Sequence, residues 1–270
     1  MEQEEKLVRK LARRFGNSVS LTALARLGCP LETNGIHIFV DLSNIAIGFW
    51  DRIKMLRNLP YARNPPINFA SLALILERGR QVARRVLAGS TMSIAYDGPP
   101  KLPWHVLDAQ ELGYESNILE RVTKLSSNPN KSKKKRGTGS GYATSGNSST
   151  SDSAFVGRMK NQEQAVDELL QMKMLESIVD TEQPSTLVLA SGDAAEAEFS
   201  GGFLKNVERA LSKGWQVEVV AWRDAMSFEY KSPGLTKKWG NRLKIIELDD
   251  FCEELLAMYT FSYRIPGDLY

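Results

Sequence analysis

Short apolar runs of the kind that form buried strands recur along this chain, and helical patterns separate them. IHIFV (36–40) and TLVLA (186–190) are nearly continuously apolar, as expected of strands that are covered on both faces. Strands that alternate with helices are typical of a parallel sheet with helices on either side. We therefore predict an α/β protein with a three-layer, Rossmann-like arrangement, in which one parallel sheet lies between two layers of helices.

The segments that support this prediction are spread over most of the chain. Strands are predicted at residues 36–40, 92–98, 112–119, 185–193, 215–222 and 243–248. Helices are predicted at residues 2–27 (one or two short ones), 67–88, 162–179, 202–214 and 249–259. The helix at 162–179 is apolar round much of its circumference, which indicates that it is well buried.

The composition excludes several classes of protein. Of the 270 residues 42% are apolar, but no apolar run approaches the ~18 residues of a membrane helix, and the opening MEQEEKLVRK is no signal peptide. The two cysteines, Cys29 and Cys252, lie far apart, which argues against a disulfide framework and against a cysteine zinc site. We therefore expect an intracellular protein of the cytoplasm or nucleus, with no membrane partner.

The excess of positive over negative charge lies in one polar segment. Residues 122–160 hold eight Lys and Arg residues against one acid, which leaves 27 basic and 31 acidic residues elsewhere. Residues 126–154 are rich in Gly and Ser and contain KSKKKR, a composition that cannot form a packed core. We interpret this stretch as a disordered insertion within the domain. Its basic run predicts salt-sensitive phosphate contacts, although a solvated linker or a nuclear-import signal would have the same composition.

Aspartates stand at the ends of several predicted strands. Asp41 ends the first strand, Asp97 the second, and TLVLA continues directly into a Ser-Gly sequence and Asp193. A further acid, Asp167, lies near the start of the apolar helix at 162–179. Ligands of open parallel sheets bind outside the carboxyl ends of the strands. We therefore expect these carboxylates to meet at one edge of the sheet.

Carboxylates that cluster in this way repel one another, and a divalent cation offsets the repulsion. Mg²⁺ and Mn²⁺ prefer oxygen ligands. Such ions activate water and stabilise the oxygens of an in-line phosphoryl displacement. The pattern therefore predicts metal-dependent hydrolysis of a phosphodiester, with Mg²⁺ or Mn²⁺ as the cofactor.

Each acid also has a structural explanation. Asp41 and Asp193 would serve equally well as helix N-caps, the latter with Glu196 in the capping-box position. Asp97 precedes a glycine, which is ordinary turn chemistry. His37, inside the first strand, is interpreted as a hydrogen-bonded core histidine rather than a ligand. The concurrence of several acids at strand ends favours a metal site over these separate explanations.

Three motifs resemble those of NYN domains, which are nucleases of the PIN-like group. They are Asp41-Leu-Ser-Asn44 after an apolar strand, Ala165-Val-Asp167 in a middle helix, and Ser191-Gly-Asp193 after a later strand. The stretch 191–220 is similar in particular to the fungal branch of that family. The resemblance implies a helical N-terminal extension (1–35), a PIN-like nuclease domain (36–260) interrupted at about 126–154, and a C-terminal tail (261–270).

The resemblance further implies a metal-dependent endoribonuclease, or an RNA-processing factor built on the same fold. The implied catalytic residues are Asp41, Asn44, Asp167 and Asp193, with Asn44 orienting a water or a phosphate. The implied metal ligands are Asp41, Asp167, Asp193 and Glu196, with Asp97 and Glu198 as secondary candidates. The chain departs from the family at Ala195, where many members have a second aspartate. Either Glu196 or Glu198 would replace that acid, or the site would hold a single ion.

RNA, most simply in single-stranded form, is the partner that this resemblance implies. RNA contacts are predicted at Ser43, Ser191, Lys131, Lys133, Lys134, Lys135 and Arg136. Two other functions stay open: a degenerate nuclease fold that binds RNA without cutting it, and phosphatase-like chemistry on a small substrate. Protein partners bound through the N-terminal helices and a homo-oligomer are also compatible with the sequence.

Overall fold

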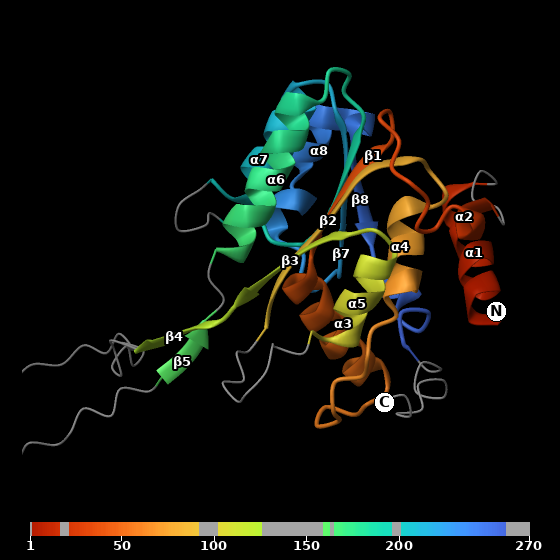
Figure 1. Ribbon diagram of the computed structural model, residues 1–270, viewed down its shortest axis with the longest axis vertical. Coiled ribbons are helices and arrows are strands. Elements are labelled where there is room, and N and C mark those ends of the chain that lie inside the picture. The colour runs from red at the N-terminus through yellow and green to blue at the C-terminus, as the bar shows by residue number, and fades with distance from the viewer. Residues whose placement is uncertain are drawn as a thin grey trace, which may run out of the picture.

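The central element of the structure is a six-stranded parallel sheet (Figure 1). The computed structural model describes residues 2–16, 22–91, 102–125, 159–162, 165–195 and 201–257. The strands of the sheet are β1 (Ile36–Asp41), β2 (Val82–Thr91), β3 (Glu115–Glu120), β6 (Thr186–Ala190), β7 (Gln216–Ala221) and β8 (Leu243–Glu247). Their order is β3-β2-β1-β6-β7-β8, and all neighbours are parallel. The predicted α/β class is confirmed.

The direction in which the sheet grows reverses at β1. The chain lays β2 and then β3 on one side of β1, returns to lay β6 on its other side, and continues outward through β7 to β8. In this register Asp41 lies beside Ala88 of β2, and Val40 lies beside Ala190 of β6. Ligands of open α/β sheets bind outside the strands' carboxyl ends at such a reversal. The ends of β1 and β6 are therefore where this topology places a ligand site.

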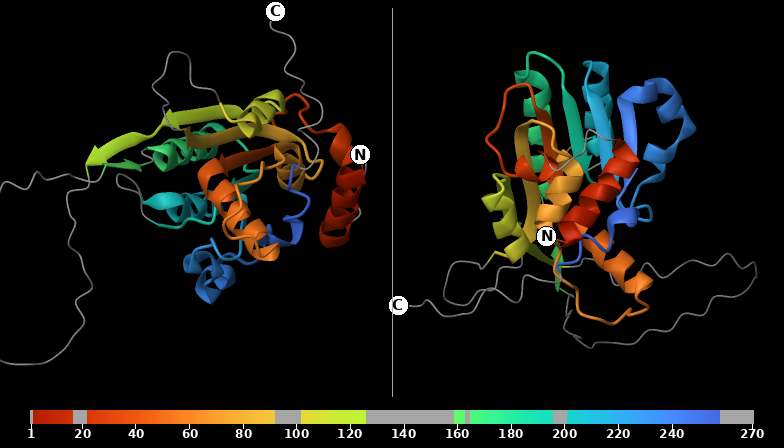
Figure 2. Two further views of the ribbon diagram at one scale, coloured as in Figure 1. Left: turned by 90° about the horizontal axis from the view of Figure 1, so that it is seen from below. Right: turned by 90° about the vertical axis from the view of Figure 1, so that its right-hand side faces the viewer.

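Helices cover both faces of the sheet and complete three layers (Figures 1 and 2). One layer contains α1 (Glu2–Phe15), α2 (Thr22–Ala25), α3 (Leu42–Leu56), α4 (Phe69–Glu77) and α5 (Trp104–Glu111). The other contains α6 (Val166–Asp180), α7 (Gly202–Ser212), η1 (Phe228–Lys231), α8 (Pro233–Trp239) and η2 (Gly240–Arg242). No helix in the described part of the chain is long and apolar enough to cross a membrane.

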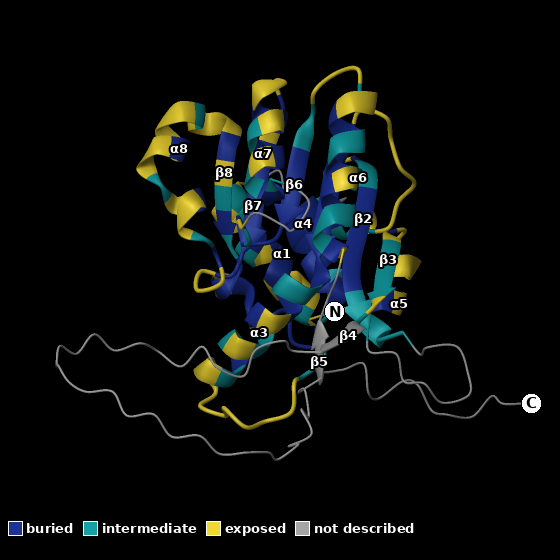
Figure 3. Cartoon of the chain, turned by 90° about the vertical axis from the view of Figure 1, so that its left-hand side faces the viewer, coloured by how far each residue is buried: buried dark blue, intermediate teal, exposed yellow. Residues whose placement is uncertain are grey.

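Two apolar clusters, one on each face of the sheet, hold these layers together. Ile38 and Val40 of β1 pack into the cluster under α3 and α4, whereas Phe39 packs into the cluster under α6 and α7. The alternation follows from the two-residue period of a strand. Figure 3 shows the result, with β6 buried along most of its length and the edge strand β3 only partly buried.

The N-terminal helices belong to the first of these layers. Leu7 and Leu11 of α1 have no exposed surface and pack into the same cluster as Ile38 and Val40. The side-chain amide of Gln3 donates hydrogen bonds of 3.0–3.3 Å to three backbone carbonyls between 253 and 256. The apolar side of α1 is thus already covered by the chain's own core, so a protein partner bound there would have to use its polar side.

One predicted helix, at residues 67–88, is wrong in its second half. α4 ends at Glu77, and the next two residues, Arg78 (φ 51°) and Gly79 (φ 73°), are both in the left-handed region, which ends a helix. The residues beyond the turn form β2 instead. The second strand of the sheet therefore precedes the predicted one at 92–98, and that segment lies outside the described residues.

The predicted C-terminal helix is also wrong. Only a short 3-10 turn, η3 (Asp249–Phe251), forms there. Beyond it the chain pairs with a distant segment: the amide of Asn68 donates to the carbonyl of Leu255 (2.8 Å), and the amide of Ala257 donates to that of Pro66 (3.1 Å). Backbone groups bound in this way cannot also serve an α-helix, so the tertiary pairing overrides the helical pattern.

The helix predicted at 162–179 is α6, and its burial is one-sided. Leu170 and Met174 have no exposed surface, but Met172 is exposed and Val179 is 77% exposed. The apolar residues are thus distributed round the helix as predicted, while only one face of it packs against the sheet.

A small second sheet lies before α6. β4 (Val122–Leu125) and β5 (Met159–Gln162) pair antiparallel, with Leu125 opposite Met159. The residues directly before position 126 and directly after position 158 therefore lie side by side. The predicted insertion at 126–154 falls between the two strands and lies outside the described residues.

Candidate active site

Asp41 and Ser191 meet at the point where the strand order reverses. Asp41 ends β1, is 4% exposed, and caps α3 by accepting a hydrogen bond from the amide of Asn44 at Oδ1 (3.0 Å). Ser191 follows β6, and its hydroxyl donates to Oδ2 of Asp41 (2.9 Å). Both carboxylate oxygens are therefore held by donors from different elements. The capping role considered for Asp41 is real, and the same carboxylate also joins two strands.

Asn44 and Asp193 complete this arrangement. The side-chain oxygen of Asn44 accepts a hydrogen bond from the amide of Gly192 (3.0 Å), which leaves the side-chain NH₂ as a donor. The amide of Asp193 donates to the Ser191 hydroxyl oxygen (3.3 Å). Four residues singled out from the sequence, Asp41, Asn44, Ser191 and Asp193, are thus joined by hydrogen bonds at the carboxyl edge of the sheet.

Asp193 is not a helix cap. Its Oδ1 accepts from the amide of Ala195 (2.8 Å), which closes a local turn. α7 begins only at Gly202, with Gly201 as its N-cap. Among the described residues Asp193 forms no ion pair. Its half-buried carboxylate is therefore held by the loop at the end of β6 and not by a helix terminus.

A loop that follows β7 fixes the backbone of this segment. The hydroxyl of Tyr230 donates to the carbonyl of Asp193 (3.0 Å), and the amide of Ser227 donates to the carbonyl of Gly192 (2.8 Å). A Cβ on Gly192 would lie 2.6 Å from the carbonyl oxygen of Ala225, so only glycine permits this approach. Burial and the charge of Asp193 raise the pKa of Tyr230, which keeps its hydroxyl protonated. The sequence analysis did not identify Tyr230. The only sequence signal for this contact was the glycine in Ser-Gly-Asp, which is typical of a close backbone approach.

Asp167 lies at the same edge of the sheet, in the first turn of α6. Because α6 runs antiparallel to the strand that follows it, its N-terminus lies near the carboxyl ends of the strands (Figure 1). The adjacent Val166 packs in one cluster with Ala88, which is the neighbour of Asp41 in β2. An acid in the first turn also stabilises a helix through the helix dipole, so Asp167 has a structural role here whatever its chemistry.

The complete metal-binding set is not present among the described residues. In that part of the chain no three or more His, Cys, Asp or Glu side chains form a group placed to hold one ion. Several predicted site residues lie outside it, namely Asp97, Glu196, Glu198, Lys131, Lys133, Lys134, Lys135 and Arg136. Asp167 therefore does not join Asp41 and Asp193 in one such group, and a third carboxylate from Asp97, Glu196 or Glu198 stays a prediction.

The two serines predicted to contact RNA lie in different surroundings. Ser191 has no exposed surface, so its hydroxyl positions Asp41 and does not reach an RNA molecule in this structure. Ser43 lies in the first turn of α3 and lines a pocket at the surface. The prediction for Ser191 is thus replaced by a role in holding the carboxylate.

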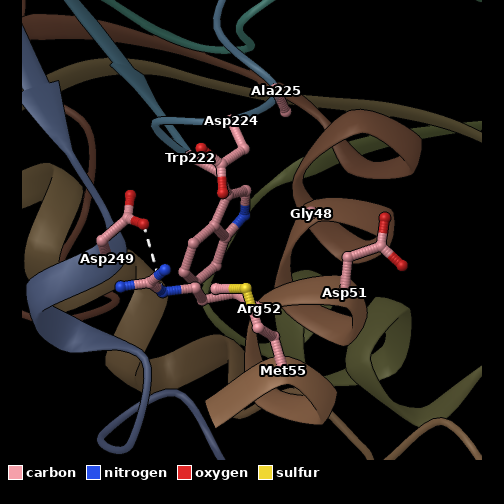
Figure 4. Close-up of a pocket in the computed structure, with 8 residues that line it drawn as sticks. All are labelled: Gly48, Asp51, Arg52, Met55, Trp222, Asp224, Ala225 and Asp249. Atoms are coloured by element: carbon pink, nitrogen blue, oxygen red, sulfur yellow. Dashed lines mark ion pairs between the residues drawn. The ribbon is translucent and has the colours of Figure 1, made fainter. Parts of the chain in front are cut away.

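Two pockets flank α3 at this edge of the sheet. The larger, of about 220 Å³, has Trp222 on one side and three aspartates, Asp51, Asp224 and Asp249, against one arginine, Arg52 (Figure 4). Arg52 and Asp249 form an ion pair of 3.2 Å. The smaller, of about 120 Å³, lies on the other flank of α3 and is bounded by α5 and β3. The acidic pocket is unfavourable for a phosphate, whereas the described lining of the smaller pocket contains Arg121 and no acidic residue.

No family model, no curated protein and no solved structure matches this chain.

The two histidines do not take part in the cluster. His37 is buried in β1, where its ring packs edge-on against Trp215 at 5.0 Å, and within the described part of the chain neither ring nitrogen has a hydrogen-bond partner. Burial, together with the charge of Arg84, lowers its pKa to about 4. It is a core residue as predicted, but it is not hydrogen-bonded. His105 lines the smaller pocket, and burial lowers its pKa.

Proposed function

We propose that this protein is a metal-dependent endoribonuclease that hydrolyses phosphodiester bonds of single-stranded RNA. The observation that carries the proposal is the hydrogen-bonded group of Asp41, Asn44, Ser191 and Asp193 at the strand-order reversal. Oxygen-rich side chains gather there from the ends of two strands. An open parallel sheet binds its ligands at this place.

The chemistry of the group fits a single Mg²⁺ or Mn²⁺ ion. Such an ion needs only one or two carboxylates, because it keeps several waters and also binds phosphate oxygens of the substrate. Asp41 and Asp193 supply two carboxylates, and a carboxylate offers about four acceptor sites in all. When bound, the ion would supply an activated water and stabilise charge on the phosphate. Glu196, which lies outside the described residues, would be its further ligand.

The chain's own residues would hold these groups in position. Ser191 and the amide of Asn44 fix the plane of the Asp41 carboxylate, which spares the site the cost of ordering it when substrate binds. The Asn44 NH₂ is a donor suited to a water or a phosphate oxygen. The likeness of the Asp41 and Asp193 motifs to NYN domains supports the same reaction class.

A cleavage assay on end-labelled single-stranded RNA tests the proposal. We expect internal cuts by the parent with Mn²⁺ or Mg²⁺, none with EDTA, and none by Asp41→Asn. Asp180→Asn is the matched control, because Asp180 is an exposed acid at the far end of α6. Cleavage that persists in EDTA, or that Asp41→Asn retains, would exclude the mechanism.

A binding module without catalysis is the second candidate function. Two observations favour it: hydrogen bonds already engage both oxygens of Asp41, and Ala195 stands at a position that is acidic in many NYN domains. In that case the same assay gives no product with any metal, while the protein still retards labelled RNA in a native gel.

A further inference from the structure

The smaller pocket beside α3 has the composition of a site for a flat, partly polar group. Its walls are formed by α3, by α5 and by the ends of β2 and β3. Among the described residues, apolar side chains make up most of the lining, and the polar residues are Ser43, Ser90, His105 and Arg121. With about 120 Å³ it is well below the roughly 300 Å³ of pockets for whole drug-sized ligands. It has room for one small group of a larger ligand.

We propose that this pocket binds one nucleobase of a single-stranded RNA, next to the phosphodiester at the Asp41–Asp193 site. The inference rests on the proposed function and assigns to the site its first base-binding position.

The apolar wall offers a fixed ring for stacking. The indole nitrogen of Trp50 donates to the carbonyl of Pro65 (3.0 Å), which restrains the ring of this lining residue. Ile47, one turn back on α3, is 51% exposed and lies in the same lining. Bases of single-stranded nucleic acids stack on such aromatic side chains whatever their sequence. The wall therefore suits the face of a base.

The polar residues suit the edge of a base and the adjoining phosphate. Arg121 donates from Nε to the hydroxyl of Ser90 (2.8 Å), which brings its guanidinium into the pocket lining. The lowered pKa of His105 keeps its imidazole neutral near pH 7, with one donor nitrogen and one acceptor nitrogen. A nucleobase edge presents the same mixture of donors and acceptors.

The pocket and the candidate active site share the first turn of α3. Leu42 and Ser43 line the pocket, while their neighbours Asp41 and Asn44 belong to the hydrogen-bonded group. Adjacent residues are only about 3.8 Å apart, so a base in the pocket places its sugar and phosphate beside the carboxylates. The opposite flank of α3 is lined by aspartates, which would repel the phosphate chain. The RNA is therefore expected on the Arg121 flank.

Binding of six-nucleotide RNAs in EDTA, followed by fluorescence anisotropy, tests the inference without cleavage. The probes are one intact RNA and six copies in which each position in turn is abasic. For the parent we expect one position whose base removal weakens binding by about tenfold, as for loss of a stacked base. Arg121→Gln and Ile47→Ala should weaken binding of the intact RNA and lose sensitivity at that position.

Two controls isolate the pocket. Met55→Ala changes an exposed apolar residue of the same helix that lines the acidic pocket, and Arg13→Gln removes an exposed arginine from α1. Both should keep the abasic effect of the parent. Ile47→Ala alters an exposed side chain, so this variant is expected to fold even if Arg121→Gln does not.

The outcomes separate this inference from the proposed function. If the parent binds and cuts RNA but Ile47→Ala and Arg121→Gln keep the full abasic effect, the pocket assignment is wrong and the nuclease remains. If the parent binds no RNA and cuts none, both are wrong. Loss of the abasic effect in the two pocket variants alone supports the assignment.

Discussion

The hydroxyl of Ser191 donates a hydrogen bond of 2.9 Å to Oδ2 of Asp41, although 150 residues separate the two in the sequence. The bond joins the carboxyl ends of β1 and β6, the two strands at which the sheet reverses its direction of growth. Because Asp41 is almost fully buried, the bond both satisfies a carboxylate oxygen and fixes its orientation.

Ser191→Ala should therefore destabilise the fold and impair the site. A buried acceptor that loses its donor costs about 1–3 kcal/mol, which urea unfolding would measure. Ser185→Ala is the matched control, because Ser185 lies just before the start of β6 and donates to the carbonyl of Gly35 (2.8 Å). Both variants should lose stability, but only Ser191→Ala should lose RNA cleavage. Equal cleavage by the two would show that the serine serves the fold alone.

Asp193→Asn should leave the metal-free protein as stable as the parent, or more stable. Asparagine can still accept the hydrogen bond from Ala195, and removal of one charge relieves repulsion within the group. The stabilisation by Mn²⁺ should disappear together with cleavage. Melting curves with and without Mn²⁺ measure the first, and an RNA assay the second. A variant that Mn²⁺ still stabilises as much as the parent would remove Asp193 from the metal site.

Gly48→Ala should destabilise the protein, although alanine is normally preferred within a helix by about 1 kcal/mol. A Cβ at position 48 would collide with the indole ring of Trp222, which is held by a hydrogen bond to the carbonyl of Ile45 (2.9 Å). We expect a loss of about 1–3 kcal/mol, as for overpacking of a core. At Gly234 in α8 no atom of the described residues lies within 4 Å of the added carbon, so Gly234→Ala should be neutral or stabilising.

The buried His37 should make stability depend on pH between about 4 and 6.5. Its pKa is lowered to about 4 in the folded protein from 6.5, so the unfolded chain binds the extra proton as the pH falls. Stability is then lost on acidification, by up to about 3 kcal/mol. His37→Leu should remove this part of the difference between unfolding at pH 7 and at pH 4.5. His105→Gln should retain it, and identical slopes for parent and His37→Leu would contradict the prediction.

Replacing residues 126–158 by Asn-Gly should leave the domain folded. Leu125 and Met159 are paired across β4 and β5, and a two-residue turn of this kind closes an antiparallel hairpin. RNA affinity and its salt dependence should both fall, by at most about 3.5 in the slope of log affinity against log salt if all five residues of the basic run contact phosphate. Glutamine at those five positions is the length-matched control. Unchanged affinity would reduce the segment to a linker or a targeting signal.

The strands that the sequence predicted best are those in which local pattern and tertiary environment agree. β1 and β6 are nearly continuously apolar because both faces are covered, and the alternation of strands and helices allowed the polar residues that follow them to be placed at one edge of the sheet. The prediction was wrong for the second half of the helix at 67–88, because the apolar spacing there fits both a helical and a strand period. The left-handed backbone of Arg78 and Gly79 ends the helix and decides between the two. Backbone conformation of that kind leaves only a weak trace in composition.

The remainder of the site depends on contacts that no local pattern records. Tyr230 is held against the carbonyl of Asp193 by the path of the chain after β7. The pocket beside α3 brings together Ser90, His105 and Arg121 from three separate elements. The sequence alone does not show that these residues lie together. Their proximity depends on the sheet register and on the packing of α5.

The central position of β6 also sets when the site can come into existence during synthesis. β1, β2, β3 and the helices up to α6 are complete before β6 is translated, so until then one edge of β1 has no neighbour. Open strand edges of this kind pair with other chains. A chain interrupted before residue 186 would therefore contain Asp41 without Ser191 or Asp193, and would be prone to associate with copies of itself. Insertion of β6 brings Ser191 and Asp193 to Asp41 and covers the open edge of β1 in the same step.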